Sequence, residues 1–156
     1  MNESSLADAG LRTTLPRRLI LNIMENSAQR HLGAEDIYRA LHESGEEVGI
    51  ATVYRVLTQF EQSGIVIRHR FDGDKAYYEL NDEAHHDHMV CVECGRVFEF
   101  IDDAIEQRQR EVASAAGFVL QDHSLCLYGV CEGMQSSKKC SMPKESEPGI
   151  YQVEKE

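Results

Sequence analysis

The chain has 156 residues, of which 42% are hydrophobic and 28% charged, a composition typical of a soluble globular protein with one domain or two small ones. Its apolar runs fall far short of the roughly 18 residues that span a bilayer, and its start lacks the features of a signal peptide, which predicts a cytoplasmic protein. The net charge of −11 argues against non-specific nucleic-acid binding by bulk charge, although local basic groups can still bind.

Acidic residues and metal-binding residue types gather in the second half. Residues 1–80 have a net charge of −3 and residues 81–156 one of −8, and the second half holds all five cysteines and four of the seven histidines. Carboxylates, thiolates and imidazoles bind divalent metals. An odd number of cysteines without a secretion signal favours metal ligands or buried thiols over a disulfide framework.

Residues 1–80 are predicted to form three helices and a β-hairpin. The first helix begins after Thr14 with Pro16 in its first turn, the second begins after Gly33, and the third runs to about Ser63 before Gly64. Apolar residues at helical spacing are expected to be buried. They are Leu15, Leu19, Ile23 and Met24, then Ile37, Ala40 and Leu41, then Val53, Val56, Leu57 and Phe60.

Two β-prone runs, residues 65–71 and 75–80, flank a Gly-containing turn and predict the hairpin. Short helices at a tight turn followed by a hairpin are the parts of a winged helix-turn-helix, whose later helix enters the major groove. Exposed arginines are commonly only solvated, but their place on this helix and hairpin favours DNA contact. The candidate DNA-binding residues are Arg12, Thr52, Tyr54, Arg55, Arg68 and Arg70.

The second half is predicted to contain two strands over residues 89–100, a helix from Asp102 or Asp103 to Ala116, and a strand over 118–128. Because the core of this half is small, we expect it to be stabilised by dimerisation, by a structural metal ion, or by both. The predicted fold class is therefore α+β, in four segments. They are a winged-helix DNA-binding domain (1–80), a hinge (81–84), a metal-binding α/β dimerisation domain (85–131) and a largely disordered tail (132–156).

The cysteine pattern favours a structural zinc site. Cys91 and Cys94 form a Cys-x2-Cys-Gly knuckle, which places two thiolates within reach of one Zn²⁺. A redox pair is the alternative, but no thioredoxin-like βαβ pattern surrounds the knuckle. Cys131 and Cys140 could complete the site, although their spacing is long, and Cys126 is most simply a small buried residue of an apolar strand.

Residues 85–88, His85-His86-Asp87-His88, are the most informative four of the chain. If the segment is extended, alternation sends His85 and Asp87 to one side and His86 and His88 to the other, which suits two separate metal sites. A solvated polar loop is the ordinary alternative. Further ligands could come from His31, Glu79, Glu99, Glu106 and His123.

Several of these further candidates also have ordinary structural roles. Glu106 could close a capping box from Asp103, Glu99 could face outward from a strand, and His31 could occupy a surface loop. Spacing alone leaves their assignment open.

Five collinear segments resemble the ferric uptake regulator family over about residues 8 to 131: residues 10–17, 34–38, 49–57, 85–91 and 123–125. The resemblance implies a winged-helix DNA-binding domain, an α/β dimerisation domain, and a homodimer that binds palindromic AT-rich operators when loaded with divalent metal. Arg12 stands where many members have a lysine aimed at the minor groove, and Tyr54 and Arg55 match the family's reading helix.

The resemblance also implies three ligand sets. An inter-domain site would use His31, Glu79, His86, His88 and Glu99; a second site would use His85, Asp87, Glu106 and His123; and structural zinc would use Cys91, Cys94 and Cys131. The fourth zinc ligand is either Cys140 or another group, or else the site has no fourth protein ligand and is weaker. The regulatory ion implied is Fe(II), with Mn(II) as a second candidate.

The expected function is metal-gated repression of iron uptake genes, with no enzymatic activity, membrane contact or small organic substrate. Members that respond to zinc, manganese or peroxide are the alternatives, and glutamate at Glu79 and Glu99 leans away from a peroxide sensor. A metallohydrolase would need a nucleophile or His-Glu-x2-His motif, which the sequence lacks. A metal buffer would bind iron without DNA preference, and the exposed face of Thr52, Tyr54 and Arg55 argues against it.

Overall fold

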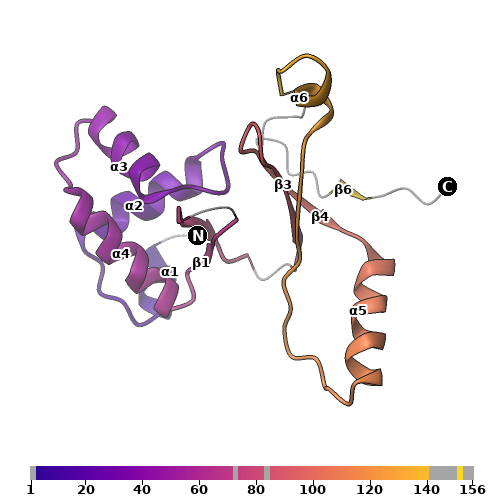
Figure 1. Cartoon of the computed structure of the whole chain (residues 1–156). Coiled ribbons are helices and arrows are strands. Elements are labelled where there is room, and N and C mark those ends of the chain that lie inside the picture. Colours follow the sequence, from indigo (N-terminus) through magenta and orange to yellow (C-terminus); the bar gives the residue numbers. More distant parts are fainter. Residues whose placement is uncertain (1–2, 72–73, 83–84, 141–150, 153–156) are drawn as a thin grey trace. The chain divides into compact units, whose positions relative to one another are not determined.

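The computed structural model describes residues 3–71, 74–82, 85–140 and 151–152, and the chain divides into two compact units, Met1–Glu83 and Ala84–Glu156. Each unit has its own sheet, and α1 to α4 belong to the first (Figure 1). Among the described residues, no helix is both long and apolar enough to cross a bilayer. The predicted α+β fold class is confirmed.

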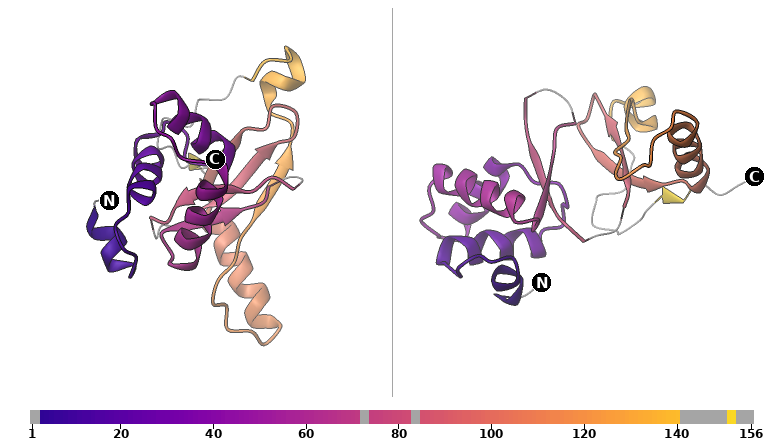
Figure 2. Two further views of the ribbon diagram at one scale, coloured as in Figure 1. Left: turned by 90° about the vertical axis from the view of Figure 1, so that its left-hand side faces the viewer. Right: turned by 90° about the horizontal axis from the view of Figure 1, so that it is seen from below.

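Four helices form the body of the first unit: α1 (Glu3–Asp8), α2 (Leu15–Asn26), α3 (Ala34–Glu43) and α4 (Ile50–Gln62). Helix α1 was not predicted, and its one turn and a half is fixed by Leu6, which is fully buried in the core. The three predicted helices are present, and α2, α3 and α4 contact one another in pairs (Figures 1 and 2).

Local chemistry sets the ends of these helices. The backbone N–H of Gly33 donates to Asp36 Oδ2 at 2.9 Å, which caps the start of α3. Just after α4, Gly64 adopts a φ of +77°, which ends that helix. The α4 stripe of Val53, Val56, Leu57 and Phe60 is buried as predicted. Leu15 was predicted to be buried, but it is 57% exposed, because the first turn of α2 projects beyond the core.

The hairpin consists of β1 (Val66–His69) and β2 (Tyr77–Leu80), paired antiparallel with Ile67 opposite Glu79. Both strands are shorter than predicted, and residues 72–73 of the expected turn lie outside the described residues. A two-way backbone bridge joins Leu32 to Tyr78, with N···O distances of 3.0 and 2.8 Å. This bridge brings the loop before α3 alongside β2.

The second unit contains β3 (Asp87–Cys91), β4 (Val97–Ile101), α5 (Asp103–Ala115), β5 (Cys126–Gly129), α6 (Glu132–Ser136) and β6 (Tyr151–Gln152). The sheet order is β5-β3-β4-β6; β3 and β4 are antiparallel, whereas β5 is parallel to β3 and β6 is parallel to β4. Figure 2 shows β3 and β4 running side by side. His88 lies opposite Glu99 in their register.

Three sequence predictions for this unit are wrong in detail. The strand expected over residues 118–128 begins only at Cys126, because the preceding apolar residues find no strand partner, and Val119 is 83% exposed. Helix α5 is capped by Asp102, whose Oδ1 accepts from two backbone N–H groups, so no capping box runs from Asp103 to Glu106. The tail expected to be disordered forms α6 at its start, while residues 141–150 and 153–156 lie outside the described residues.

Candidate metal centres and nucleic-acid interface

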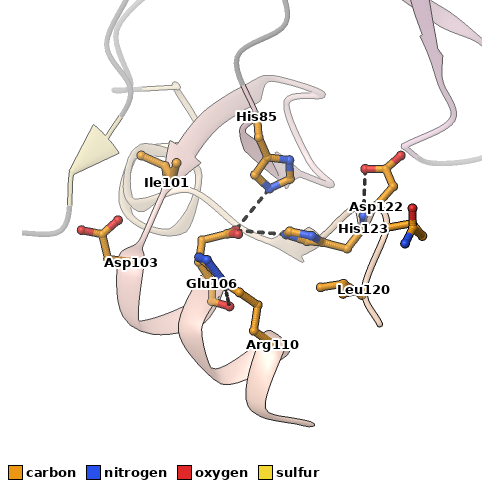
Figure 3. A pocket seen from close by; sticks show the side chains of 9 residues that line it. His85, Ile101, Asp103, Glu106, Arg110, Leu120, Asp122 and His123 are labelled. Atoms are coloured by element: carbon orange, nitrogen blue, oxygen red, sulfur yellow. Dashed lines mark hydrogen bonds and ion pairs between the residues drawn. The ribbon is translucent and has the colours of Figure 1, made fainter. Parts of the chain in front are cut away.

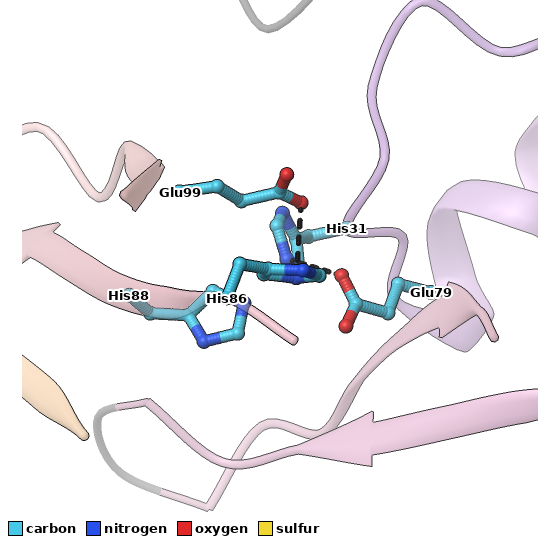
Figure 4. A group of neighbouring side chains, drawn as sticks. All are labelled: His31, Glu79, His86, His88 and Glu99. Carbon is cyan, nitrogen blue, oxygen red and sulfur yellow. Dashed lines mark ion pairs between the residues drawn. The ribbon is translucent and has the colours of Figure 1, made fainter. Parts of the chain in front are cut away.

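The first unit contains an imidazole–carboxylate pair. His31 Nε2 lies 2.9 Å from Glu79 Oε2, and both side chains are only 2% exposed (Figure 4). The bridge between Leu32 and Tyr78 makes this pair, because it aligns the residues just before and after those two. His31 is therefore buried, contrary to the surface-loop alternative.

His69 also contacts Glu79 and was missed by sequence reasoning. Its Nε2 lies 2.8 Å from Glu79 Oε1, and because an ionised carboxylate can only accept, His69 Nε2 donates. The signal was the hairpin register: Ile67 lies opposite Glu79, so His69 on the same face is its diagonal neighbour.

The second unit places two imidazoles beside a carboxylate. His86 Nε2 lies 3.4 Å from Glu99 Oε1, and the ring centroids of His86 and His88 are 4.9 Å apart. Glu99 belongs to β4 and stands opposite His88 on β3, so the strand pairing sets their proximity (Figure 4). Imidazole and carboxylate together form a donor set suited to Fe(II), Mn(II) or Zn(II).

A separate group of four ligands lies within the second unit: His85, Asp87, Glu106 and His123. Glu106 Oε1 accepts from both imidazoles, at 3.2 Å from His85 Nε2 and 3.1 Å from His123 Nε2 (Figure 3). The four ligand atoms all lie within 4.8 Å of one another. As the alternation along residues 85–88 predicts, His85 and Asp87 face this group while His86 faces Glu99.

The electrostatics of this group favour a cation. Burial raises the pKa of Glu106, but hydrogen bonds and charge from His123 and His85 outweigh it and hold that pKa below its ordinary value. Asp87 is fully buried; its Oδ1 accepts from Leu125 N at 3.2 Å, whereas its Oδ2 is buried without a hydrogen-bond partner. A buried, unpartnered carboxylate oxygen is costly unless an ion compensates it, so these residues fit a divalent metal.

A pocket of about 410 Å³ opens beside the group, and its lining includes Asp103, Arg110 and Leu120 (Figure 3). His85 has a side-chain exposure of 36%, so the group can be reached from solvent. The pocket leaves space for water or a small ligand at positions that the four side chains do not fill.

The cysteine knuckle forms a third group. The sulfurs of Cys91, Cys94 and Cys131 lie within 4.8 Å of one another, and Cys140 Sγ lies 3.9 Å from Cys131 Sγ. Gly95 takes a φ of +74° that allows the tight knuckle. Cys126 lies on β5 and is half-buried; it does not belong to this group.

The knuckle stabilises a thiolate. Burial raises the pKa of Cys91, but backbone N–H groups of Cys131, Cys94 and Glu93 donate to its sulfur and bring the pKa to about 6. Burial raises the pKa of Cys94 to about 12. One stabilised thiolate beside other thiols suits a cation such as Zn²⁺, which binds thiolates.

The candidate DNA-binding residues lie in the first unit. Arg12, Arg55 and Arg70 are exposed, and Tyr54 is 48% exposed on α4. Thr52 is half-buried on the same helix. Arg68 is exposed too, and its Nε lies 3.3 Å from Glu61 Oε1, an ion pair that joins β1 to α4.

Arg17 is a functional candidate that sequence reasoning missed. Its Nη1 donates to the backbone oxygen of Arg12 at 2.7 Å, and its Nε and Nη2 donate to Gln59 Oε1. It therefore fixes the segment that carries Arg12 against α4. Only its place in the first turn of α2 distinguished it in sequence.

A winged-helix unit followed by a unit rich in clustered imidazole, carboxylate and thiolate ligands defines a DNA-binding, metal-responsive class of transcriptional repressor. The chain matches the model of the ferric uptake regulator family over residues 8–128. It is 57% identical over 136 residues to the ferric uptake regulation protein of Legionella pneumophila, covering 86% of this chain and 100% of that relative. The chain belongs to the ferric uptake regulator family.

Solved structures agree with this assignment. The chain resembles the Vibrio cholerae ferric uptake regulator at 52% identity with a TM-score of 0.79, covering 84% of this chain and 100% of that one. It resembles the ferric uptake regulator from Pseudomonas aeruginosa with manganese at 55% identity and a TM-score of 0.73, covering 83% and 97%.

Proposed function

We propose that the protein represses iron uptake genes in the cytoplasm, binding palindromic AT-rich operators as a homodimer when Fe(II) is available. One observation carries the proposal: imidazole–carboxylate donors flank the segment between the two units. His31 and Glu79 belong to the winged-helix unit, whereas His86, His88 and Glu99 belong to the other. Neither set alone fills the coordination shell of a divalent transition metal.

The two donor sets together would form the regulatory site. Both sets would hold one divalent ion, whose positive charge would offset the charges of Glu79 and Glu99, and the shared coordination would restrain the proposed hinge at residues 81–84. His31 and Glu79 would anchor the winged-helix unit, and the reading helices of a dimer would be held at the spacing of successive major grooves.

The two remaining groups would have other roles. Cys91, Cys94 and Cys131 would hold structural zinc with Cys140 as the fourth ligand, an assignment supported by its 3.9 Å separation from Cys131. The group of His85, Asp87, Glu106 and His123 would hold a second divalent ion beside the pocket in the dimerisation unit.

The DNA contacts would divide by chemistry. Arg55 on α4 would read a guanine edge with two hydrogen bonds, and Tyr54 and Thr52 would line the same contact. Arg12 would enter the minor groove, while Arg68 and Arg70 would approach phosphates from the wing. Because the chain is acidic, neutralisation of its clustered carboxylates would also ease the approach to DNA.

Fluorescence anisotropy tests the proposal. Zinc-loaded protein is titrated anaerobically onto a palindromic AT-rich duplex and a scrambled duplex, with Fe(II), Mn(II), Zn(II) or chelator. We expect selective binding that appears with Fe(II) and is reversed by chelator. Arg55→Ala should weaken this binding, whereas Arg39→Ala, which removes an exposed arginine of α3, should not. Strongest binding with Mn(II) or Zn(II) would reassign the effector, and equal metal-independent binding to both duplexes would refute the proposal.

A further inference from the structure

His69 stands on β1 of the winged-helix unit, and its Nε2 donates to Glu79 Oε1 at 2.8 Å. We propose that His69 is a positioning residue, which holds the Glu79 carboxylate in its metal-binding orientation and joins it to the DNA-binding wing. The proposal rests on the proposed function, in which Glu79 is a ligand of the regulatory ion.

The two oxygens of Glu79 face different partners. Oε1 accepts from His69, whereas Oε2 lies 2.9 Å from His31 Nε2. Two ligand atoms that are each about 2.1 Å from a metal and at right angles to one another lie about 3 Å apart. The spacing of Oε2 and His31 Nε2 therefore already suits adjacent ligands, and the bond to Oε1 keeps Oε2 directed towards His31.

Ring contacts fix His69 in turn. Its ring stacks on Phe71 with centroids 5.1 Å apart and an interplanar angle of 10°, and the Phe71 ring meets that of His31 edge-on at 5.4 Å. Phe71 is buried, and Glu79 is only 1% exposed. A carboxylate buried this deeply needs donors, so the hydrogen bond from His69 stabilises the charge as well as the orientation.

The position of His69 connects the carboxylate to the DNA-binding surface. Its neighbours in sequence, Arg68 and Arg70, are the wing arginines, and Arg68 is paired with Glu61 of α4 at 3.3 Å. A shift of Glu79 on metal binding would therefore act on β1 and, through this ion pair, on α4. Because binding free energies couple reciprocally, operator DNA should strengthen metal binding through the same contacts.

Two substitutions separate the hydrogen bond from the ring packing. His69→Phe keeps a ring to stack on Phe71 but cannot donate, whereas His69→Gln loses the ring but can still donate. His42→Ala is the matched control, because His42 is an exposed histidine of the same unit on α3. All variants are made in the full chain with Asp87→Asn, which removes the separate group of His85, Asp87, Glu106 and His123 from the titration and leaves His86, His88 and Glu99 intact.

The readout is the Kd for Co(II) in zinc-loaded protein, measured with and without operator DNA. Binding is monitored through the visible absorption of the bound Co(II). His69→Phe should raise this Kd by roughly 10- to 100-fold, the usual effect of losing a partner of a metal ligand, and bring the ratio of the Kd values without and with DNA towards one. His69→Gln should restore much of both, and His42→Ala should change neither.

An unchanged Kd in folded His69→Phe would overturn the positioning role. A raised Kd with an unchanged DNA ratio would overturn the link to the wing. Thermal unfolding of each zinc-loaded variant shows that the comparison is between folded proteins. Metal-independent operator binding by the parent protein would instead refute the proposed function. In that case, the Kd for Co(II) without DNA would still test whether His69 positions Glu79.

Discussion

Arg17 on α2 and Gln59 on α4 are joined by two hydrogen bonds, from Arg17 Nε at 3.2 Å and Nη2 at 2.9 Å to Gln59 Oε1. A third bond, from Nη1 to the backbone oxygen of Arg12 at 2.7 Å, extends the connection to the segment before α2. One guanidinium therefore sets the position of Arg12 relative to the exposed face of α4.

We expect Arg17→Ala to weaken operator binding although Arg17 itself need not touch DNA, because Arg12 loses its fixed position. The lost hydrogen bonds should also lower the free energy of unfolding by about 1–2 kcal/mol. The loss is smaller than at a buried site because the side chain is partly exposed. Anisotropy and urea unfolding measure the two effects. Arg39→Ala is the control, and operator affinity equal to that of the wild type would contradict this role.

Asp87→Asn should abolish tight metal binding at the group of His85, Asp87, Glu106 and His123. The amide oxygen can still accept from Leu125 N, so the fold is expected to persist, but the negative charge and the second carboxylate oxygen are lost. The loss of affinity should exceed the roughly 10- to 100-fold caused by removing an outer partner. Calorimetric titration with Mn(II) tests this, with Asp103→Asn at the pocket edge as control; two intact sites in Asp87→Asn would disprove the assignment.

The lowered pKa of Glu106 predicts a pH dependence of stability in protein whose group of His85, Asp87, Glu106 and His123 holds no metal. A carboxylate whose pKa is lower in the folded state stabilises the fold above its unfolded value near 4.5, and this contribution is lost as the pH falls through the folded value. Glu106→Gln should therefore be less stable than wild type at pH 6, with the difference shrinking below pH 4.5. Urea unfolding at each pH measures this difference, with Glu111→Gln, an exposed position of the same helix, as the matched control.

Cys140→Ser should weaken zinc retention although Cys140 lies far along the chain from the knuckle. Its sulfur is 3.9 Å from that of Cys131, so its removal should leave a three-thiolate site that loses zinc faster to a chelator and unfolds at a lower temperature. Zinc release followed with a colorimetric chelator tests this. Cys126→Ser, outside the group, is the control, and equal release from both variants would exclude Cys140 as a ligand.

Much of the winged-helix unit was predictable because its signals are local. Gly33, Gly64 and the apolar stripe of α4 are read within one or two helical turns, and the structure has these features where the sequence predicts them. Helix α1 was not predictable in this way: it is too short for periodicity, and only the burial of Leu6 in the core fixes it.

The second unit was harder because its elements depend on partners distant in sequence. The apolar run from Phe118 has strand propensity, but only residues from Cys126 onward pair with β3, so the strand is shorter than its composition suggests. Likewise, the polar composition after residue 131 predicted disorder, yet Glu132–Ser136 is helical.

The sequence by itself determined the chemistry of this protein: the ligand types, the knuckle, and the division of residues 85–88 between two faces, because alternation along a strand is a local property of the backbone. Only the tertiary structure decided which distant groups meet. The Leu32–Tyr78 bridge brings His31 to Glu79, the hairpin register brings His69 there as well, and α5 presents Glu106 to His123. These contacts depend on how separate elements pair and pack, which spacing along the chain does not encode.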